Sequence, residues 1–129
     1  MRAGLAIAVA GLAFAAVAVA ASPPALTGRY SVKLTMLQPP SLDGTWALRF
    51  AAGSAYSLTT NGAVVESGVY TLHASTLILH DTSGPLHCAP SLSGSYRSIR
   101  TGAKLRLVLI ADRCTTRSAI LAHTFAKAT

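Results

Sequence analysis

The chain has 129 residues, of which 11 are Lys or Arg and four are Asp or Glu, giving a formal net charge of +7. A chain of this length builds one domain of modest size rather than several. Four carboxylates also leave little material for acid–base chemistry on sugars, which needs a well-placed pair of them.

The N-terminal segment has the three parts of a secretory signal. Arg2 supplies the positive charge, residues 3–20 are all apolar or glycine, and the run ends on an Ala-x-Ala site. We expect a signal peptide over 1–20, cleaved after Ala20 or one residue later, and a short lead over 21–27. The alternative is a transmembrane anchor, but the run is alanine-rich, barely long enough to span, and lacks a basic stop-transfer flank. The expected location is therefore secreted or periplasmic, with no membrane span in the mature chain.

The mature chain contains two cysteines, Cys88 and Cys114. An even count in an exported protein indicates a disulfide, and both cysteines fall near the ends of neighbouring candidate elements. We therefore predict a Cys88–Cys114 bridge, which stabilises the fold by about 3.5 kcal/mol on the chain-entropy model. The alternative, two unpaired buried thiols, is unusual in an oxidising compartment.

The excess of positive charge is of a kind that attracts nucleic acid, anionic lipid or an acidic envelope polymer. The bases are scattered rather than clustered, and several alternate with apolar residues, as in Lys104-Leu105-Arg106-Leu107. We interpret them as the solvated outer face of a sheet. Export also argues against a nucleic-acid partner.

The mature chain has the pattern of successive hairpins, with short runs of Val, Leu, Thr, Tyr and Ile between turn residues. No stretch shows a helical period, although a single helical turn within 83–90 or 113–117 stays open. We predict an all-β fold, an antiparallel up-and-down meander of about eight strands closing into a small barrel, as one domain over 28–129. The expected strands are 28–37, 44–51, 55–60, 63–73, 76–81, 94–100, 103–111 and 118–125.

A weak internal repeat, Gly-x-aromatic, marks four of these strands, at 28–30, 44–46, 68–70 and 94–96. Glycine there permits a bend or bulge, and the aromatic residue two positions later points to one face. Two of the four repeats lead through a hairpin to an acid at the end of the next strand, Asp81 and Asp112. Kinks of this kind suit a sheet that curls and closes on itself.

Two motifs carry a family resemblance: Gly44-Thr45-Trp46 and the run Asp-Arg-Cys-Thr-Thr-Arg at 112–117. They resemble the lipocalin-like barrels of the calycin superfamily, in which a Gly-x-Trp opens an early strand and an Arg near the last strand packs across the Trp ring. The resemblance implies that Trp46 and Arg117 form this barrel-closing pair through a cation–π contact. In that family the Gly-x-Trp strand comes first, so segment 28–37 is here either a lead-in or an additional strand.

The order of short motifs is also similar to that of small secreted bacterial domains, over most of residues 42–125. Gly-x-Trp alone is a weak motif, whereas the occurrence of six such motifs in the same order along the chain is moderately specific. The motifs in question are Gly-Thr-Trp at 44–46, Asn-Gly at 61–62, Asp-Thr-Ser-Gly-Pro at 81–85, Cys88, Gly-x-Tyr-Arg at 94–97 and Asp-x-Cys-x-x-Arg at 112–117.

The histidines and the segment 80–83 offer no catalytic or metal-binding constellation. His73 and His80 are expected at opposite ends of neighbouring strands, so no metal site is predicted. His, Asp and Ser within 80–83 are the residue types of a nucleophile triad, but neighbours on a strand point to opposite faces and cannot form the relay. We therefore predict no enzyme activity and no cofactor.

The two strand-end acids have a structural interpretation instead. Asp81 and Asp112 are expected to accept hydrogen bonds from loop backbone amides. Asp112 is also placed to pair with Arg113 or Arg117.

Strand alternation directs five aromatic side chains inward, as candidate ligand-binding residues: Trp46, Phe50, Tyr56, Tyr70 and Tyr96. Such side chains either fill a barrel of about eight strands or line a site for one small ligand. The first hypothesis is therefore a secreted lipocalin-like binding module for a small apolar ligand. The alternative is an extracytoplasmic protein-interaction or inhibitor domain that acts through its disulfide-tied loop at 82–91.

Overall fold

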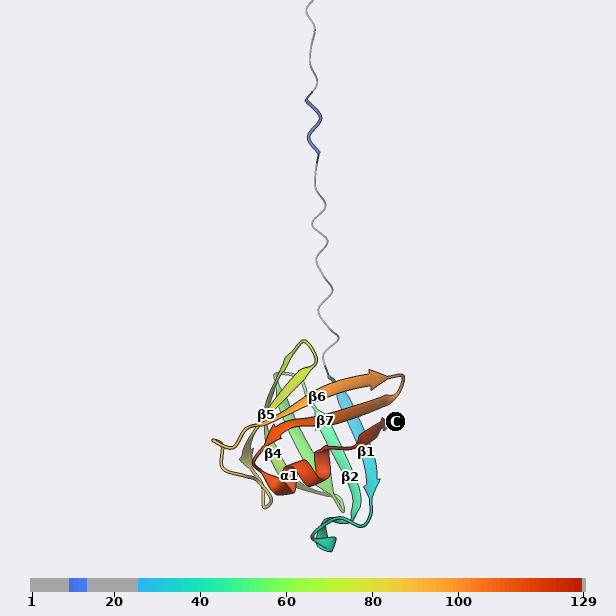
Figure 1. Cartoon of the computed structure of the whole chain (residues 1–129), viewed down its shortest axis with the longest axis vertical. Helices are drawn as coiled ribbons and strands as arrows, with labels where there is room; N and C mark the ends of the chain where they lie inside the picture. The colour runs from blue at the N-terminus through green and yellow to red at the C-terminus, as the bar shows by residue number, and fades with distance from the viewer. Residues whose placement is uncertain (1–9, 14–25, 129) are drawn as a thin grey trace, which may run out of the picture.

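Eight antiparallel strands close into a barrel in the computed structural model, which describes residues 10–13 and 26–128 (Figure 1). Each strand pairs with the next along the chain, and β1 pairs with β8 to complete the closure. The predicted all-β up-and-down meander is confirmed. The predicted cleavage site, nearly all of the predicted signal peptide over 1–20 and most of the lead over 21–27 lie outside the described residues.

The strands are joined by turns, by one long loop over 84–93, and by segments that contain a 3-10 helix and an α-helix. In chain order the elements are β1 (Gly28–Leu34), η1 (Pro40–Leu42), β2 (Gly44–Phe50), β3 (Ala55–Thr60), β4 (Ala63–His73), β5 (Thr76–Ser83), β6 (Gly94–Thr101), β7 (Lys104–Asp112), α1 (Thr115–Leu121) and β8 (Thr124–Lys127).

The first expected segment, 28–37, is a barrel strand rather than a lead-in. It pairs with β2 over its whole observed length, from Gly28 opposite Phe50 to Leu34 opposite Gly44. Trp46 therefore lies on the second strand of this barrel and not on the first.

The expected strand over 118–125 is wrong, because Thr115–Leu121 forms α1 and β8 covers only Thr124–Lys127. Arg117, Ile120 and Leu121 follow the i, i+3, i+4 spacing that puts side chains on one helix face, and all three are buried. Helix α1 lies beside the lower half of β7 (Figure 1). No helix in the described part of the chain is long and apolar enough to cross a membrane.

The predicted hairpin turn at 61–62 and two of the four possible glycine bulges are present. Asn61 and Gly62 both have positive φ, 51° and 76°, as a type I′ hairpin turn requires. Register shifts occur at Ser67/Gly68 and at Ser95/Tyr96, so two of the Gly-x-Tyr segments do contain a bulge.

The two ends of the barrel differ. Three hairpin turns, joining β2–β3, β4–β5 and β6–β7, lie at the end where β1 begins, which we call the upper end. The lower end carries η1, the long loop over 84–93 and α1. The long segments that a site needs are therefore gathered at the lower end.

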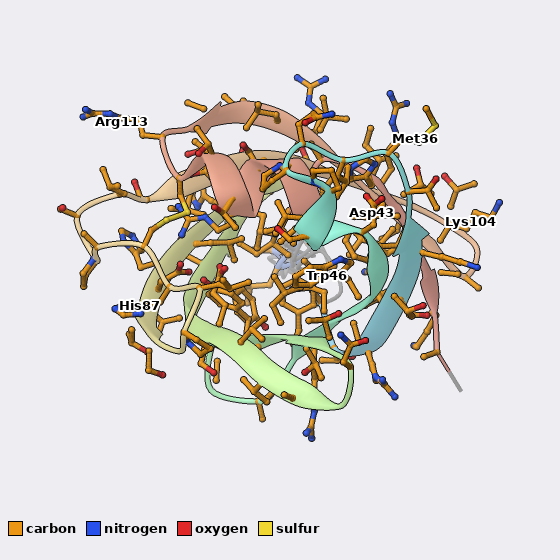
Figure 2. The ribbon with its side chains drawn as sticks, turned by 90° about the horizontal axis from the view of Figure 1, so that it is seen from below. Met36, Asp43, Trp46, His87, Lys104 and Arg113 are labelled. Carbon is orange, nitrogen blue, oxygen red and sulfur yellow. A yellow bond between two sulfur atoms is a disulfide. The ribbon has the colours of Figure 1, made fainter. Side chains whose placement is uncertain are left out.

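Apolar and aromatic side chains form one buried cluster inside the barrel. Phe50 belongs to this cluster and makes edge-to-face contacts with Tyr70 at 5.0 Å and with Tyr30 at 6.3 Å between ring centroids. Leu26, from the segment before β1, is also buried, and its carbonyl accepts a hydrogen bond from the Tyr70 hydroxyl at 3.1 Å. Figure 2, which views the barrel from the lower end, shows Trp46 within the ring of strands.

Candidate functional site

Three fully buried polar side chains lie inside the lower half of the barrel. Glu66 comes from β4, Asp81 from β5 and Arg117 from α1, and each has a relative exposure of 0%. A buried ionisable group is costly unless a partner compensates it, so the contacts of these three side chains define the site.

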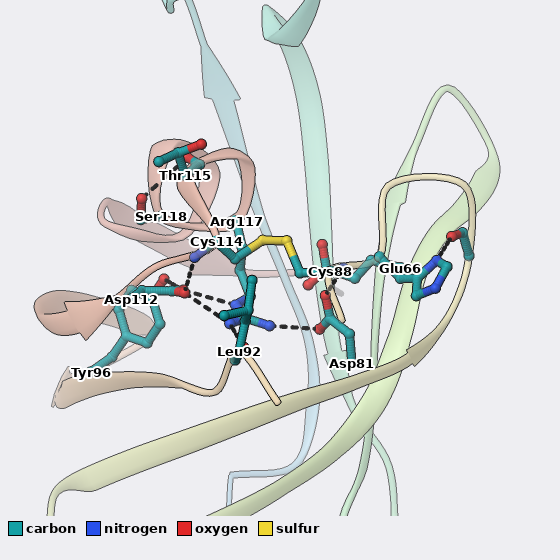
Figure 3. Close-up of a disulfide and its surroundings, with 12 residues drawn as sticks. Glu66, Asp81, Cys88, Leu92, Tyr96, Asp112, Cys114, Thr115, Arg117 and Ser118 are labelled. Atoms are coloured by element: carbon teal, nitrogen blue, oxygen red, sulfur yellow. Dashed lines mark hydrogen bonds and ion pairs between the residues drawn. A yellow bond between two sulfur atoms is a disulfide. The ribbon is translucent and has the colours of Figure 1, made fainter. Parts of the chain in front are cut away.

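Arg117 is the centre of the cluster (Figure 3). Its Nε and Nη2 donate to the two carboxylate oxygens of Asp112, both at 2.8 Å, in the fork geometry that suits a guanidinium. Its Nη1 forms an ion pair with Asp81 Oδ1 at 2.9 Å, without the alignment of a hydrogen bond. Nη2 also donates to the Leu92 carbonyl at 2.5 Å. One guanidinium therefore joins the ends of β5 and β7 to the 84–93 loop.

The same two aspartates hold the backbone of the disulfide. Asp81 Oδ2 accepts the Cys88 amide and Asp112 Oδ1 accepts the Cys114 amide, each at 2.9 Å. The Cys88–Cys114 bridge is confirmed, with a Cα–Cα distance of 6.0 Å. The predicted amide contacts of Asp81 and Asp112 are also confirmed, and Arg117 is the arginine that pairs with Asp112. Disulfide and ion cluster thus form one unit.

Two glycines, which have no side chain, make room for the side chains of the cluster. Gly68 stands between Tyr56 and Asp81 on neighbouring strands. A Cβ on Gly68 would lie 2.0 Å from the His80 carbonyl oxygen and 2.8 Å from the Tyr56 ring. The Tyr56 hydroxyl crosses this gap to donate to Asp81. Gly94 stands opposite Asp112, where a Cβ would meet the Asp112 carboxylate. Two of the four repeat glycines, Gly68 and Gly94, are therefore needed for close approach.

Glu66 is the unusual member of the cluster. Burial raises its pKa to about 8, and the hydrogen bond and negative charge of Asp81 act in the same direction. The Tyr56 hydroxyl lies 3.4 Å from Glu66 Oε1, and Oε2 has no hydrogen-bond partner. The raised pKa favours the protonated form of Glu66 at neutral pH, next to the ionised carboxylate of Asp81.

The other groups of the cluster keep their ordinary charge. Burial alone raises the pKa of Asp81, but hydrogen bonds from Glu66, Tyr56 and the Cys88 amide outweigh it, and the net direction is downward. Burial lowers the pKa of Arg117, yet the Asp112 and Asp81 carboxylates reverse this and raise it. Burial and a carboxylate partner raise the pKa of both Tyr56 and Tyr96. The cluster consists of one cation, two anions and neutral donors.

The 84–93 loop is held from several sides. The Leu86 amide donates to the Val65 carbonyl at 2.9 Å, and His80 Nδ1 lies 3.3 Å from the Pro90 carbonyl oxygen. With the disulfide and the Asp81 and Arg117 contacts, these bonds place the loop backbone. Six of its residues are nevertheless exposed to solvent: Pro85, His87, Ala89, Pro90, Ser91 and Ser93.

The five predicted ligand-binding aromatics lie in the core, none more than 8% exposed. Tyr56 and Tyr96 donate to Asp81 and Asp112, and Trp46 Nε1 donates to the Leu42 carbonyl at 2.8 Å. Their part in ligand binding stays a prediction. So does the barrel-closing pair, since the contacts described for Arg117 are with the two aspartates and Leu92 rather than with Trp46.

Sulfur and carboxylate atoms also lie together, because Asp81 and both cysteines offer ligand atoms within 4.8 Å of one another. In the oxidised protein, however, both sulfurs are bonded to each other. Arg117 also holds its positive charge against Asp81. This group is therefore a disulfide site rather than a cation site.

Sequence reasoning missed the meeting of Glu66 with Asp81. A signal was present, since Glu66 shares its strand parity with Tyr70 and Leu72, and Asp81 shares its parity with Leu77 and Leu79. Both acids were therefore on inward positions.

No protein-family model, no curated protein and no solved structure matches the chain. Function is accordingly inferred from the geometry of the site.

Proposed function

We propose that this chain is an extracytoplasmic, non-catalytic protein-binding module whose contact surface is the 84–93 loop. The observation that carries the proposal is the anchoring of this loop by the Cys88–Cys114 bridge and the Arg117 cluster. A loop whose backbone is already ordered loses little conformational entropy when it binds. The disulfide supports an oxidising compartment, and the closed eight-stranded barrel supports a lipocalin-like origin.

The exposed loop side chains indicate the chemistry of the partner. They are small or neutral, and include His87 and two prolines. The exposed Arg113 follows the lower end of β7, whereas Lys104 begins β7 at the upper end (Figure 2). An uncharged contact area on a basic protein fits a protein partner with an acidic surround, because opposite charges speed association and favour the correct partner.

The test compares two alanines at opposite ends of the barrel. Ala89 is exposed in the loop, and Ala52 is exposed in the β2–β3 turn at the upper end. A photo-crosslinking residue at each position, used on intact secreting cells, is expected to trap a partner from position 89 only. With the purified partner, Ala89→Glu is expected to weaken binding about tenfold or more, and Ala52→Glu to leave it unchanged. Equal effects of the two substitutions contradict the proposal.

The apolar-ligand hypothesis predicts a different result. A ligand that reaches Phe50 and Tyr70 has to displace side chains that now contact each other. Native mass spectrometry of the secreted protein then shows a small-molecule adduct, which apolar solvent removes. Such an adduct, with no partner trapped at position 89, favours the ligand-binding module over the loop-binding one.

A further inference from the structure

Three of the four carboxylates of this chain are buried, and the fourth, Asp43, is exposed in the loop before β2. Glu66, Asp81 and Asp112 have fully buried side chains. Asp43 accepts the backbone amides of Met36 and Leu37 in the loop before β2, at 3.1 and 2.7 Å. The basic residues show the opposite distribution, because Arg117 alone among those described is buried. The outer surface is left with positive charge and almost no negative charge.

Five exposed bases share the outer face of four neighbouring strands, β7, β8, β1 and β2. The strand register places Arg29 directly opposite Arg49 and Lys33 opposite Thr45. Lys104 projects from the outside of the barrel on the side of β1 (Figure 2). We call this surface the basic face; it consists of Arg29, Lys33, Arg49, Lys104 and Arg106.

The Arg29–Arg49 pair is unfavourable in the protein alone. Like charges directly opposite each other on a sheet repel. Within the described part of the chain, neither arginine has a carboxylate within ion-pair distance. Arg29 and Lys33 lie four residues apart on β1, or roughly 13 Å along the strand. A ligand with repeated negative charges matches this spacing, whereas a single small anion contacts only part of it.

Hydroxyl and amide side chains lie beside the bases in two shallow hollows of the outer surface. One hollow, of about 310 Å³, contains Arg49 together with Ser57 and Ser67. The other, of about 220 Å³, contains Arg29 together with Thr59 and Asn61. A guanidinium binds an anionic group, and neighbouring hydroxyl and amide side chains donate to and accept from neutral hydroxyls. Together these groups match the donors and acceptors of a charged sugar.

We propose that the basic face binds an anionic polysaccharide, one bearing carboxylate or sulfate groups along its length. The positions between the bases carry small side chains, among them Ser31, Ala47 and Ala126. An interfacial lipid site needs large apolar anchors, and a single-stranded nucleic-acid site needs aromatic platforms. This face is distinct from the 84–93 loop, so the inference does not rest on the proposed partner binding.

The experiment uses two double variants with the same net charge. Arg29→Gln/Arg49→Gln changes the centre of the basic face. Arg97→Gln/Arg113→Gln removes two exposed bases outside the five that define it, one on β6 and one just after β7. Binding to heparin and to polygalacturonate is measured at about 0.15 M NaCl. We expect the basic-face variant to bind about tenfold more weakly than wild type, and the control variant to stay within about twofold. Thermal melting checks that both variants fold.

Three results overturn the inference. Equal losses in the two variants mean that only net charge matters. Tighter binding of wild type to vesicles of phosphatidylglycerol and phosphatidylcholine, or to single-stranded DNA, assigns the face to another partner. Absence of polysaccharide binding at physiological salt leaves the face without the proposed ligand. None of these results bears on whether Ala89 contacts a protein.

Discussion

Individual residues in the lower end of the barrel are explained by the partners they require. Arg117 is tolerated in the core because two aspartates and a carbonyl satisfy it, and removing one partner of such a group typically costs about 3–5 kcal/mol. Gly68 and Gly94 provide room for a tyrosine ring and for a carboxylate. Glu66 is buried with one oxygen unpartnered, and burial raises its pKa, which favours the protonated form.

Glu66 makes stability depend on pH in a defined direction. The folded protein keeps the Glu66 proton up to about pH 8, whereas the unfolded chain releases it near its ordinary value of 4.5. The native state therefore binds more protons between these two values, and its free energy of unfolding falls as pH rises. One such proton changes stability by at most about 1.4 kcal/mol per pH unit.

Glu66→Gln is expected to remove this dependence, because glutamine has the size and neutral charge of the protonated acid. Urea unfolding at about pH 5 and at about pH 8 measures the slope in each protein. The wild type is expected to lose more stability over this interval than the variant. Parallel slopes would show that Glu66 is already ionised in the folded protein.

Among the elements, α1 and the 84–93 loop depend on each other. The bridge joins Cys88 in the loop to Cys114 just before α1, and Arg117 within α1 reaches Leu92 in the loop. The helix and the loop are not joined to each other by a ladder of backbone hydrogen bonds such as pairs two strands. Covalent and ionic contacts therefore position both of them on the end of the barrel.

Cys114→Ser is expected to lower the free energy of unfolding by about 3.5 kcal/mol in non-reducing buffer, since the bridge closes a separation of 26 residues. Wild type is expected to lose a similar amount when a reductant is added. Chemical denaturation with and without reductant measures both effects. Cys114→Ser in reductant serves as the control and should be unchanged. Identical unfolding of the two proteins in non-reducing buffer rules out a stabilising bridge.

At the scale of the whole molecule, charge is sorted between interior and exterior. The buried cluster contains three of the four acids of the chain, and the outer surface carries the bases. Surface repulsion is screened by salt, whereas contacts in a buried cluster are screened much less. Salt is therefore expected to stabilise this protein.

The free energy of unfolding should rise as NaCl increases from about 0.01 to about 0.15 M. Arg29→Gln/Arg49→Gln should show a smaller rise, because it removes one directly opposed like-charge pair. Urea midpoints at the two salt concentrations measure the effect. A midpoint that falls with salt would indicate that surface ion pairs, not repulsion, dominate.

Alternation and turn chemistry were enough to predict most of the barrel. The period of two assigned Leu105 and Leu107 to the core, and Asn61-Gly62 located a hairpin, because both signals depend only on neighbouring residues. The predicted signal peptide and the even cysteine count together predicted the disulfide, which the structure contains. These features were determined by the sequence alone.

Tertiary structure decided how the lower end is built. Whether 115–121 becomes helix or strand depends on the burial of Arg117, Ile120 and Leu121 against the finished barrel, which local pattern does not contain. Asp112 turns inward because the bulge at Ser95/Tyr96 shifts the register of β6 and β7. The meeting of Glu66, Asp81 and Arg117 likewise required closure. Strand alternation shows which way a side chain points, but only the closed sheet determines which side chains it meets.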